Sequence, residues 1–211
     1  MQDCANCCME GDKPSYNDLF NAGYAFILSR FAIRLYAPIY QHQIITAETW
    51  ASSVQGLGSE RYYRILRGDE LIAEAASLWA IVGTHDKKLH RYSELDLHYR
   101  TDEPLDIASC MRFRMPQADF EERGTKTVAY EDIDQNGHMN NAHYPDMLCG
   151  FIGNMTGIRV TEFSINYRTE APLGEKLTVT CANADGAHYL RTFRSDGTVN
   201  VDAKIVTEKL N

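Results

Sequence analysis

A weak internal repeat constrains the fold of this 211-residue chain more than any other feature of its sequence. Phe31 and Ile33 match Phe163 and Ile165, and the same order continues with three more pairs, namely Thr46 with Thr178, Arg64 with Arg191, and Ala76 with Ala203. The spacing changes once, around residues 53–60, where the first copy is rich in Gly and Ser, as expected for a loop that differs between duplicates. The chain is therefore expected to contain two copies of one structural unit.

Both copies are predicted to consist mainly of β-strands. Residues 44–50 and 177–181 are rich in strand-forming side chains, and residues 67–70 and 195–198 are typical of hairpin turns. The fold class is therefore predicted to be α+β, with two antiparallel sheets in one chain, each wrapped around a central helix.

One apolar helical pattern is found in each copy, at residues 1–9 in the first and 141–155 in the second. A strand-like segment, residues 125–130, precedes the second helix, whereas no such segment precedes the first. We therefore expect the first unit to lack its opening strand.

Domain boundaries are expected where the chain becomes polar and irregular. Pro104 and Pro116 interrupt that region and act as breakers of regular structure. The prediction is a first unit at residues 1–90, a linker at 91–120 and a second unit at 121–211.

Charge and hydropathy exclude several functions. The net charge of −8 argues against a nucleic-acid partner, which requires a concentrated basic surface. The weakly polar stretch at residues 71–83 is too short to span a bilayer, and no secretory signal is visible at the N-terminus. A cytoplasmic protein without a membrane partner is expected.

Three of the six cysteines, Cys4, Cys7 and Cys8, form a C-x-x-C-C cluster. A metal or redox site is one interpretation, but no second pair completes a four-ligand zinc set. In a helix, Cys4, Ala5, Cys8 and Met9 would share one face and pack as small hydrophobic residues. We expect this packing role, and no metal or cofactor.

A dense polar segment at residues 130–144 leads directly into the second helical pattern. Asp134, Asn136 and His138 place a carboxylate, an amide and an imidazole within five residues, beside the partial positive charge of a helix N-terminus. Such groups are the components of a hydrolytic site. Taken singly, each also has a structural interpretation, as a turn residue, a helix cap or a core histidine.

The pattern D-x-N-x-H-x-N-N, from Asp134 to Asn141, resembles the acyl-ACP thioesterase family of plants and bacteria. Residues 25–30 resemble the family's W-V-L-S-R segment, and residues 163–170 resemble its strand leading to a catalytic Glu, here Glu170. The resemblance covers nearly the whole chain. It implies a double hot-dog fold and hydrolysis of the thioester that links a fatty acyl chain to acyl carrier protein.

The same resemblance implies that Asp134, Asn136, His138 and Glu170 form one catalytic site. Either carboxylate could act as the base, Asn136 could orient a water or a carboxylate, and His138 could move a proton. Plant members carry a Cys directly after the catalytic Glu, where this chain has Ala171, so a mechanism that requires that thiol cannot operate here.

Backbone N–H groups near Asn140 and Asn141 could face the oxyanion, and one of these two residues is also expected to cap the helix. The first unit, chiefly its residues 1–40, is left to hold the acyl chain.

Three alternatives remain from the sequence: acyl-ACP hydrolysis, acyl-CoA hydrolysis, and a non-catalytic acyl-binding paralogue. An acidic carrier protein would require a basic patch on this acidic chain, and the candidates are Arg61, Arg64 and Arg67; Lys87, Lys88 and Arg91; or Arg112 and Arg114. The assembly is expected to be a monomeric pseudo-dimer or a homodimer.

Overall fold

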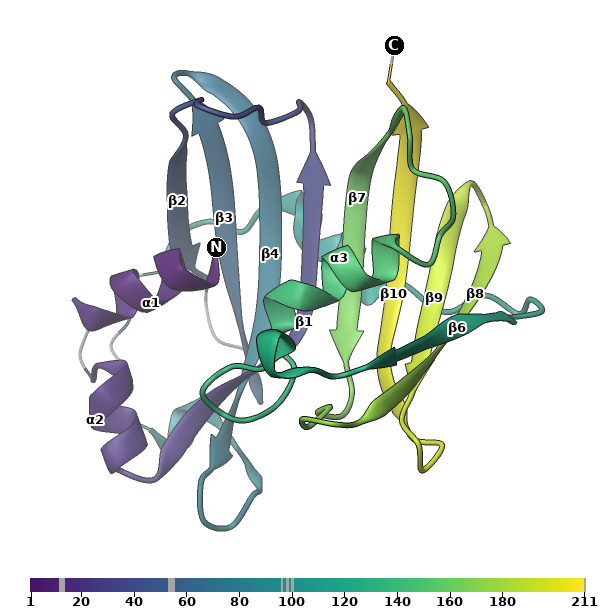
Figure 1. Ribbon diagram of the computed structural model, residues 1–211. Helices are drawn as coiled ribbons and strands as arrows, with labels where there is room; N and C mark the ends of the chain where they lie inside the picture. Colours follow the sequence, from purple (N-terminus) through teal and green to yellow (C-terminus); the bar gives the residue numbers. More distant parts are fainter. Residues whose placement is uncertain (12–13, 53–55, 96, 98, 100, 211) are drawn as a thin grey trace. The chain divides into compact units, whose positions relative to one another are not determined.

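The computed structural model describes residues 1–11, 14–52, 56–95, 97, 99 and 101–210. The chain divides into two compact units, Met1–Arg112 (unit 1) and Phe113–Asn211 (unit 2) (Figure 1). This division falls within residues 91–120, and the exact limits of the linker and of the two flanking domains remain predictions.

Unit 1 is an antiparallel sheet accompanied by short helices. The helices are α1 (Gln2–Glu10), α2 (Tyr16–Asn21) and the 3-10 helices η1 (Tyr92–Glu94) and η2 (Asp106–Arg112). The strands are β1 (Tyr24–Leu35), β2 (Thr46–Ala51), β3 (Gly58–Arg67), β4 (Glu70–Gly83) and β5 (Leu89–His90). The sheet order is β2-β3-β4-β1, and β5 pairs with β4.

Unit 2 repeats this plan and adds a strand in front of its helix. Its strands are β6 (Glu121–Thr127), β7 (Ile158–Tyr167), β8 (Lys176–Ala184), β9 (Ala187–Phe193) and β10 (Val199–Lys209). Its helices are α3 (Tyr144–Cys149) and the 3-10 helices η3 (Tyr130–Asp132) and η4 (Asn141–His143). The strands are ordered β7-β10-β9-β8-β6, which is the order of unit 1 with β6 added at one edge.

The repeat found in the sequence is confirmed strand by strand, because its paired segments lie on β1 and β7, β2 and β8, β3 and β9, and β4 and β10. In unit 1 the first element among the described residues is α1, whereas β6 comes before the helix in unit 2. The asymmetry expected from the sequence is therefore present in the fold.

Both predicted hairpin turns are confirmed. β3 and β4 are joined through Gly68 at φ +60°, and β9 and β10 are joined by a turn that contains Gly197 at φ +82°. A side chain is strained at such positive φ values, so glycine at these positions allows tight turns.

Three predicted strand or loop boundaries were wrong. β2 begins at Thr46 rather than residue 44, and Ile44 is 89% exposed. The segment 125–130 is only partly strand, since β6 ends at Thr127 and Tyr130 opens η3. Of the loop expected at 53–60, residues 58–60 already belong to β3, and residues 53–55 lie outside the described part of the chain.

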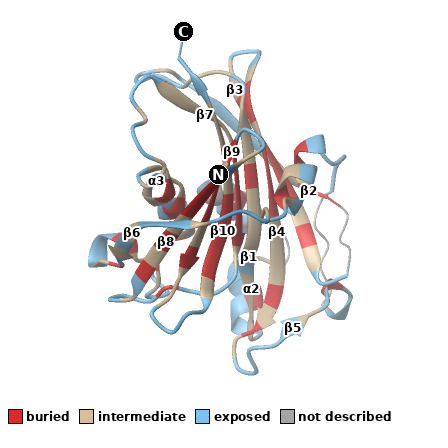
Figure 2. Cartoon of the chain, turned by 90° about the vertical axis from the view of Figure 1, so that its right-hand side faces the viewer, coloured by how far each residue is buried: buried red, intermediate tan, exposed pale blue. Residues whose placement is uncertain are grey.

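Buried residues concentrate on the central strands. β4 lies between β3 and β1, β10 lies between β9 and β7, and both carry long runs of buried side chains (Figure 2). A strand with a neighbour on each side is shielded from solvent along both edges. The small residues Ala76 on β4 and Ala203 on β10 are therefore fully buried.

The sheet of unit 1 is covered on both faces. Ala5 of α1 packs against Tyr63 and Ala75 on one face, while Ile107 and Met111 of η2 pack into a separate cluster. Residues 106–112 were expected to be irregular linker, and that expectation was wrong for this stretch. Ala108 and Cys110 of the same helix also pack against this cluster.

The helix of unit 2 is much shorter than the predicted range 141–155. A 3-10 turn occupies Asn141–His143, and the α-helix ends at Cys149. Gly150 follows, and Gly153 has φ +125°, a conformation that a helix cannot contain. Only Tyr144 and Leu148 of the apolar stripe are buried within the helix.

The cysteine-rich helix α1 buries Ala5, while Cys4 and Cys8 are half-buried and Cys7 is exposed. Over the described ranges, no three His, Cys, Asp or Glu side chains are grouped as metal ligands would be. None of the helices in those ranges has the length and apolar character needed to cross a membrane.

Candidate active site

The polar segment of unit 2 forms a closed loop between residues 133 and 139. Ile133 and Met139 form an isolated antiparallel bridge, and the Asp134 N–H donates to the His138 carbonyl at 3.1 Å. The Gly137 N–H donates to the Asp134 carbonyl at 3.0 Å, and Gly137 turns the chain at φ +79°. The loop therefore presents Asp134 and His138 from its two adjacent arms.

A second set of backbone contacts joins this loop to the segment that follows β7. His138 forms a bridge with Pro172, and the Met139 N–H donates to the Ala171 carbonyl at 2.8 Å. Glu170, more than thirty positions away in sequence, is thereby fixed beside the loop. Ala171 is buried and supplies a backbone acceptor, a role in which its side chain takes no part.

Two of the predicted catalytic residues, Asp134 and Glu170, face the imidazole of His138, and the fourth, Asn136, binds Asp134. The imidazole Nδ1 lies 3.9 Å from Asp134 Oδ1, and its Nε2 lies 3.7 Å from Glu170 Oε1. Asn136 donates its backbone N–H to Asp134 Oδ1 at 2.8 Å and its side-chain Nδ2 to Asp134 Oδ2 at 3.5 Å. An imidazole with a carboxylate at each ring nitrogen can accept a proton at one nitrogen while the carboxylate at the other nitrogen stabilises the positive charge that results.

The two carboxylates differ in their access to solvent. The side chain of Asp134 is 26% exposed and that of His138 is 24% exposed, whereas Glu170 is 73% exposed. Both Asp134 oxygens also face Asn136 donors. Glu170 is therefore the carboxylate that water and substrate can reach, and Asp134 is the one held in place behind the imidazole.

Asn140 has the predicted capping role. Its Oδ1 accepts the Ala142 N–H at 3.0 Å, and its own N–H donates to the Asp132 carbonyl at 2.8 Å. This N–H is therefore already used within the loop. Asn141 accepts the Tyr167 hydroxyl at its carbonyl, at 3.1 Å, and a role of its N–H toward an oxyanion stays a prediction.

Asp132 is a supporting residue that the sequence did not single out. Its buried carboxylate accepts from Lys126 Nζ at 2.7 Å and from the Ala129 N–H at 2.8 Å. Burial acts to raise the pKa of Asp132, but the hydrogen bonds from Lys126 and Ala129 outweigh it and hold that pKa below its usual range. The ionised Asp132 thus secures the start of the loop that carries the candidate site residues.

Replacing Lys126 with Met is expected to destabilise the protein by about 1 to 3 kcal/mol at pH 7, because the buried Asp132 charge loses its partner. The lowered folded-state pKa means that Asp132 adds stability above its unfolded pKa of about 4 and loses it as the pH falls further. The stability of the variant, measured by urea denaturation at a series of pH values, should therefore fall less steeply below pH 4 than the stability of the wild type. Lys176→Met, at an exposed position of the neighbouring strand β8, is the matched control and should change little.

Asn200 is a second supporting residue missed by the sequence reasoning. It is fully buried, and its Nδ2 donates to the Thr169 carbonyl at 2.5 Å and to the Tyr144 hydroxyl at 3.0 Å. Its Oδ1 accepts the Thr192 hydroxyl at 2.8 Å. Asn200 therefore links the residue before Glu170 to the first turn of α3. A lone polar residue at the start of a strand carried no sequence signal for this role.

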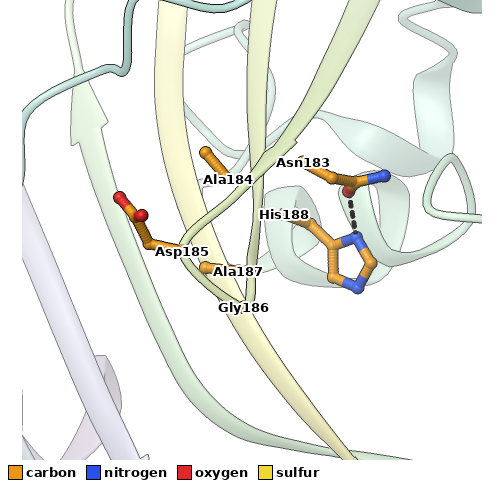
Figure 3. A pocket seen from close by; sticks show the side chains of 6 residues that line it. All are labelled: Asn183, Ala184, Asp185, Gly186, Ala187 and His188. Carbon is orange, nitrogen blue, oxygen red and sulfur yellow. Dashed lines mark hydrogen bonds between the residues drawn. The ribbon is translucent and has the colours of Figure 1, made fainter.

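A hollow of about 380 Å³ lies elsewhere in unit 2, at the β8–β9 hairpin (Figure 3). His188 and Asn183 line it, with His188 Nδ1 2.7 Å from Asn183 Oδ1. This hairpin lies beside Val206 of β10, whereas Asn200 and the candidate site lie at the opposite end of that strand. The hollow and the predicted catalytic residues therefore lie at opposite ends of β10.

Three arginines of the candidate basic patches are neutralised by ion pairs. Arg64 pairs with Glu74, Arg67 with Glu70 and Arg112 with Glu60. Arg61, a candidate for such a patch, is buried and therefore does not contribute to an exposed basic surface. A docking surface for an acidic carrier is therefore not evident from these arginines.

Comparison with solved structures confirms the predicted fold class. The chain is 24% identical to an acyl-ACP thioesterase from Bacteroides thetaiotaomicron, covering 98% of this chain and 86% of that one, with a TM-score of 0.84. The 12:0-ACP thioesterase from Umbellularia californica is 15% identical over 95% of this chain and 82% of that one, with a TM-score of 0.79. A MaoC-like dehydratase from Phytophthora capsici also matches, at 12% identity over 88% of this chain and 72% of that one, with a TM-score of 0.59. Because dehydratases share the architecture, these likenesses establish the fold alone.

Sequence profiles of protein families distinguish a thioesterase from a dehydratase of the same fold. No curated protein matches the sequence significantly. The acyl-ACP thioesterase N-terminal domain matches residues 3–95, and the acyl-ACP thioesterase C-terminal domain matches residues 116–208. The two matches occur in the family's order and together span most of the chain. This chain therefore belongs to the acyl-ACP thioesterase family.

Proposed function

We propose that the protein hydrolyses the thioester of fatty acyl-acyl carrier protein and releases a free fatty acid, with Asp134, Asn136, His138 and Glu170 as its catalytic site. Membership of the acyl-ACP thioesterase family makes the protein a thioester hydrolase and supports acyl-ACP as the proposed substrate. The observation that carries the assignment of the site is the position of His138, between Asp134 at Nδ1 and Glu170 at Nε2.

Asp134 has the role of orienting His138. Asn136 holds both oxygens of the Asp134 carboxylate, so the carboxylate presents a fixed acceptor to Nδ1. A proton on Nδ1 leaves Nε2 as the basic nitrogen on the side of Glu170. Protonation of Nε2 then produces an imidazolium that the Asp134 charge stabilises.

Glu170 and His138 Nε2 together activate the water. Glu170 accepts a hydrogen bond from water, whose oxygen attacks the thioester carbonyl carbon as its proton moves to Glu170 or Nε2. Collapse of the tetrahedral intermediate breaks the C–S bond, and the retained proton returns to the carrier thiolate. The products are one carboxylic acid and one thiol, so protons and bonds balance. The 3.7 and 3.9 Å separations would shorten on substrate binding.

Free fatty acid release from matched acyl-ACP and acyl-CoA substrates tests the proposed substrate. We expect kcat/KM to be at least about 10-fold higher for acyl-ACP, because the carrier protein adds binding energy that CoA lacks. A panel of acyl chain lengths on the same carrier would define the chain-length preference in the same assay. Equal or better turnover of acyl-CoA would instead identify an acyl-CoA thioesterase, and bound acyl chain without turnover of either substrate would contradict hydrolysis.

A cytoplasmic location, and assembly as a monomeric pseudo-dimer or a homodimer, are further parts of this proposal. The assembly follows from the fused pair of units predicted from the sequence, and the location is the expectation drawn from the sequence. Sedimentation of the purified protein distinguishes the two assemblies.

A further inference from the structure

Glu175, directly before β8, has a buried carboxylate that the proposed mechanism does not use. Its side chain is 6% exposed. One oxygen accepts from Arg194 Nε at 2.9 Å, and the other accepts the Ser195 N–H at 3.0 Å. Hydrogen bonds from Ser195 and Arg194 lower the pKa of Glu175 to about 2 against the opposing effect of burial, so this side chain is ionised at neutral pH. The carboxylate therefore holds the turn between β9 and β10 by charge-assisted hydrogen bonds.

The backbone of Glu175 is bound to two further segments. Its N–H donates to the Pro172 carbonyl at 3.0 Å, which closes a turn shortly after Glu170. Its carbonyl accepts the Val128 N–H at 2.9 Å, and the Val128 carbonyl accepts the Gly174 N–H at 2.9 Å. Val128 lies between β6 and η3, where the chain enters the polar loop of the candidate site. Glu175 therefore joins the turn after Glu170, the entrance of the polar loop and the β9–β10 turn.

The turn after Glu170 is the part of the chain that meets the polar loop. Two backbone hydrogen bonds, of 2.8 and 3.3 Å, join residues 171–173 to residues 137–139. The side chain of Glu170 is 73% exposed, and a side chain with so much solvent around it is positioned mainly by its backbone. A shift of this turn would therefore change the 3.7 Å separation between Glu170 Oε1 and His138 Nε2.

The β9–β10 connection also holds the other side of Glu170. The Thr169 hydroxyl donates to the Val199 carbonyl, at the start of β10, at 2.8 Å. The hydrogen bond to Glu175 raises the pKa of Arg194, and the nearby charge of Glu170 adds to this rise. Thr169 before Glu170 and Glu175 after it are thus bound to the same connection between two strands of the sheet. This connection is the base on which Glu170 is mounted.

We propose that Glu175 and Arg194 are positioning residues for thioester hydrolysis, whose ion pair sets the separation between Glu170 and His138. The ion pair holds the turn after Glu170 against the β9–β10 turn, and the hydrogen bonds of that turn to the polar loop then place Glu170 opposite Nε2. Misplacement of a reacting group by about 1 Å can cost about 100-fold in rate. This inference rests on the proposed function and adds to it two residues that the sequence did not single out.

Hydrolysis kinetics of Glu175→Gln with one acyl-ACP substrate test the positioning role. The amide keeps the size of the side chain and one acceptor, but it loses the charge that binds Arg194. We expect kcat to fall at least about 10-fold while KM changes by less than about 2-fold, because the placement of Glu170 matters for the chemical step and not for binding. Glu162→Gln breaks a 2.9 Å ion pair with Lys204 between β7 and β10, and this matched control should keep the wild-type kcat.

Two substitutions of Arg194 separate its charge from its bulk. Arg194→Met should lose about as much kcat as Glu175→Gln, whereas Arg194→Lys keeps the charge and should retain kcat to within about 3-fold. The double variant Glu175→Gln/Arg194→Met should be no slower than either single variant, because both remove the same ion pair. Additive losses in the double variant, or a wild-type kcat in Glu175→Gln or Arg194→Met, overturn the proposal.

Hydrogen exchange of the folded variants reports on the turn without any turnover. We expect the backbone amides of residues 173–175 and 137–139 to exchange faster in Glu175→Gln than in wild type or Glu162→Gln. Unchanged exchange together with a lowered kcat would show that Glu175 does not act through this turn, which also overturns the proposal. Failure of the hydrolysis proposal would appear as no turnover even in wild type, and the exchange comparison would then still decide whether Glu175 fixes the turn.

Discussion

Replacing His138 with Ala is expected to lower kcat for acyl-ACP hydrolysis by about 100- to 10,000-fold, the range typical of a lost general acid–base group. The imidazole lies between the two carboxylates of the site, so its removal breaks the path by which a proton leaves water and returns to the leaving thiolate. Release of fatty acid measured under single-turnover conditions reports this chemical step separately from product release.

Asp134→Ala should give a loss of similar order, because the imidazole loses the carboxylate that orients it. Neither variant should unfold the protein, since both side chains are partly exposed and the loop is closed by backbone hydrogen bonds. His188→Ala is the matched control, as a half-buried histidine of the same unit at the far hairpin, and it should retain activity. Full activity of both His138→Ala and Asp134→Ala would refute the proposed site.

Replacing Asn200 with Ala is expected to destabilise the protein by about 2 to 4 kcal/mol and to lower kcat as well. Three groups lose a partner at once: the hydroxyls of the buried residues Tyr144 and Thr192, and the Thr169 carbonyl. Unsatisfied buried polar groups are costly, and the smaller side chain adds a cavity. Urea denaturation measures the loss of stability.

The effect on activity follows from the position of Thr169 directly before Glu170. If Asn200 positions Glu170, the folded fraction of Asn200→Ala should show a reduced kcat with little change in KM. Asn200→Asp should not restore kcat, because its carboxylate cannot donate to the Thr169 carbonyl. Asn183→Ala, at an exposed asparagine that bonds His188, is the control and should alter neither quantity by much. An unchanged kcat per folded molecule would limit Asn200 to a purely structural role.

Much of the fold could be predicted because duplication and turn chemistry are local or repeated signals. Phe31 and Phe163 mark equivalent strands, and Gly68 and Gly197 mark equivalent turns, whatever the rest of the chain does. Boundaries were less predictable, because strand and helix ends depend on tertiary partners. The helix predicted to reach residue 155 ends at Cys149, and residues 106–112 pack against the sheet of unit 1 instead of forming an irregular linker.

Asp134, Asn136 and His138 were identifiable from the sequence because they lie within one short loop whose residue types suit hydrolysis. Glu170 was identified only through the resemblance to a family, since nothing in the local sequence connects it to that loop. The contact between His138 and Glu170 depends on hydrogen bonds from the loop to residues 171–173, which form only when β7 has folded.

The sequence by itself determined the duplicated β-rich plan and the family, and it proposed the loop at residues 134–138 as the site, because these features are encoded in residue types at fixed spacing. The tertiary structure alone decided which groups the fold buries. It placed Asp132 and Asn200 as buried supports of the candidate site, and it buried Arg61, which the sequence had offered as part of a basic patch. Burial depends on which elements pack over a side chain. Those elements come from distant parts of the chain, and the local spacing of residues does not predict where they pack.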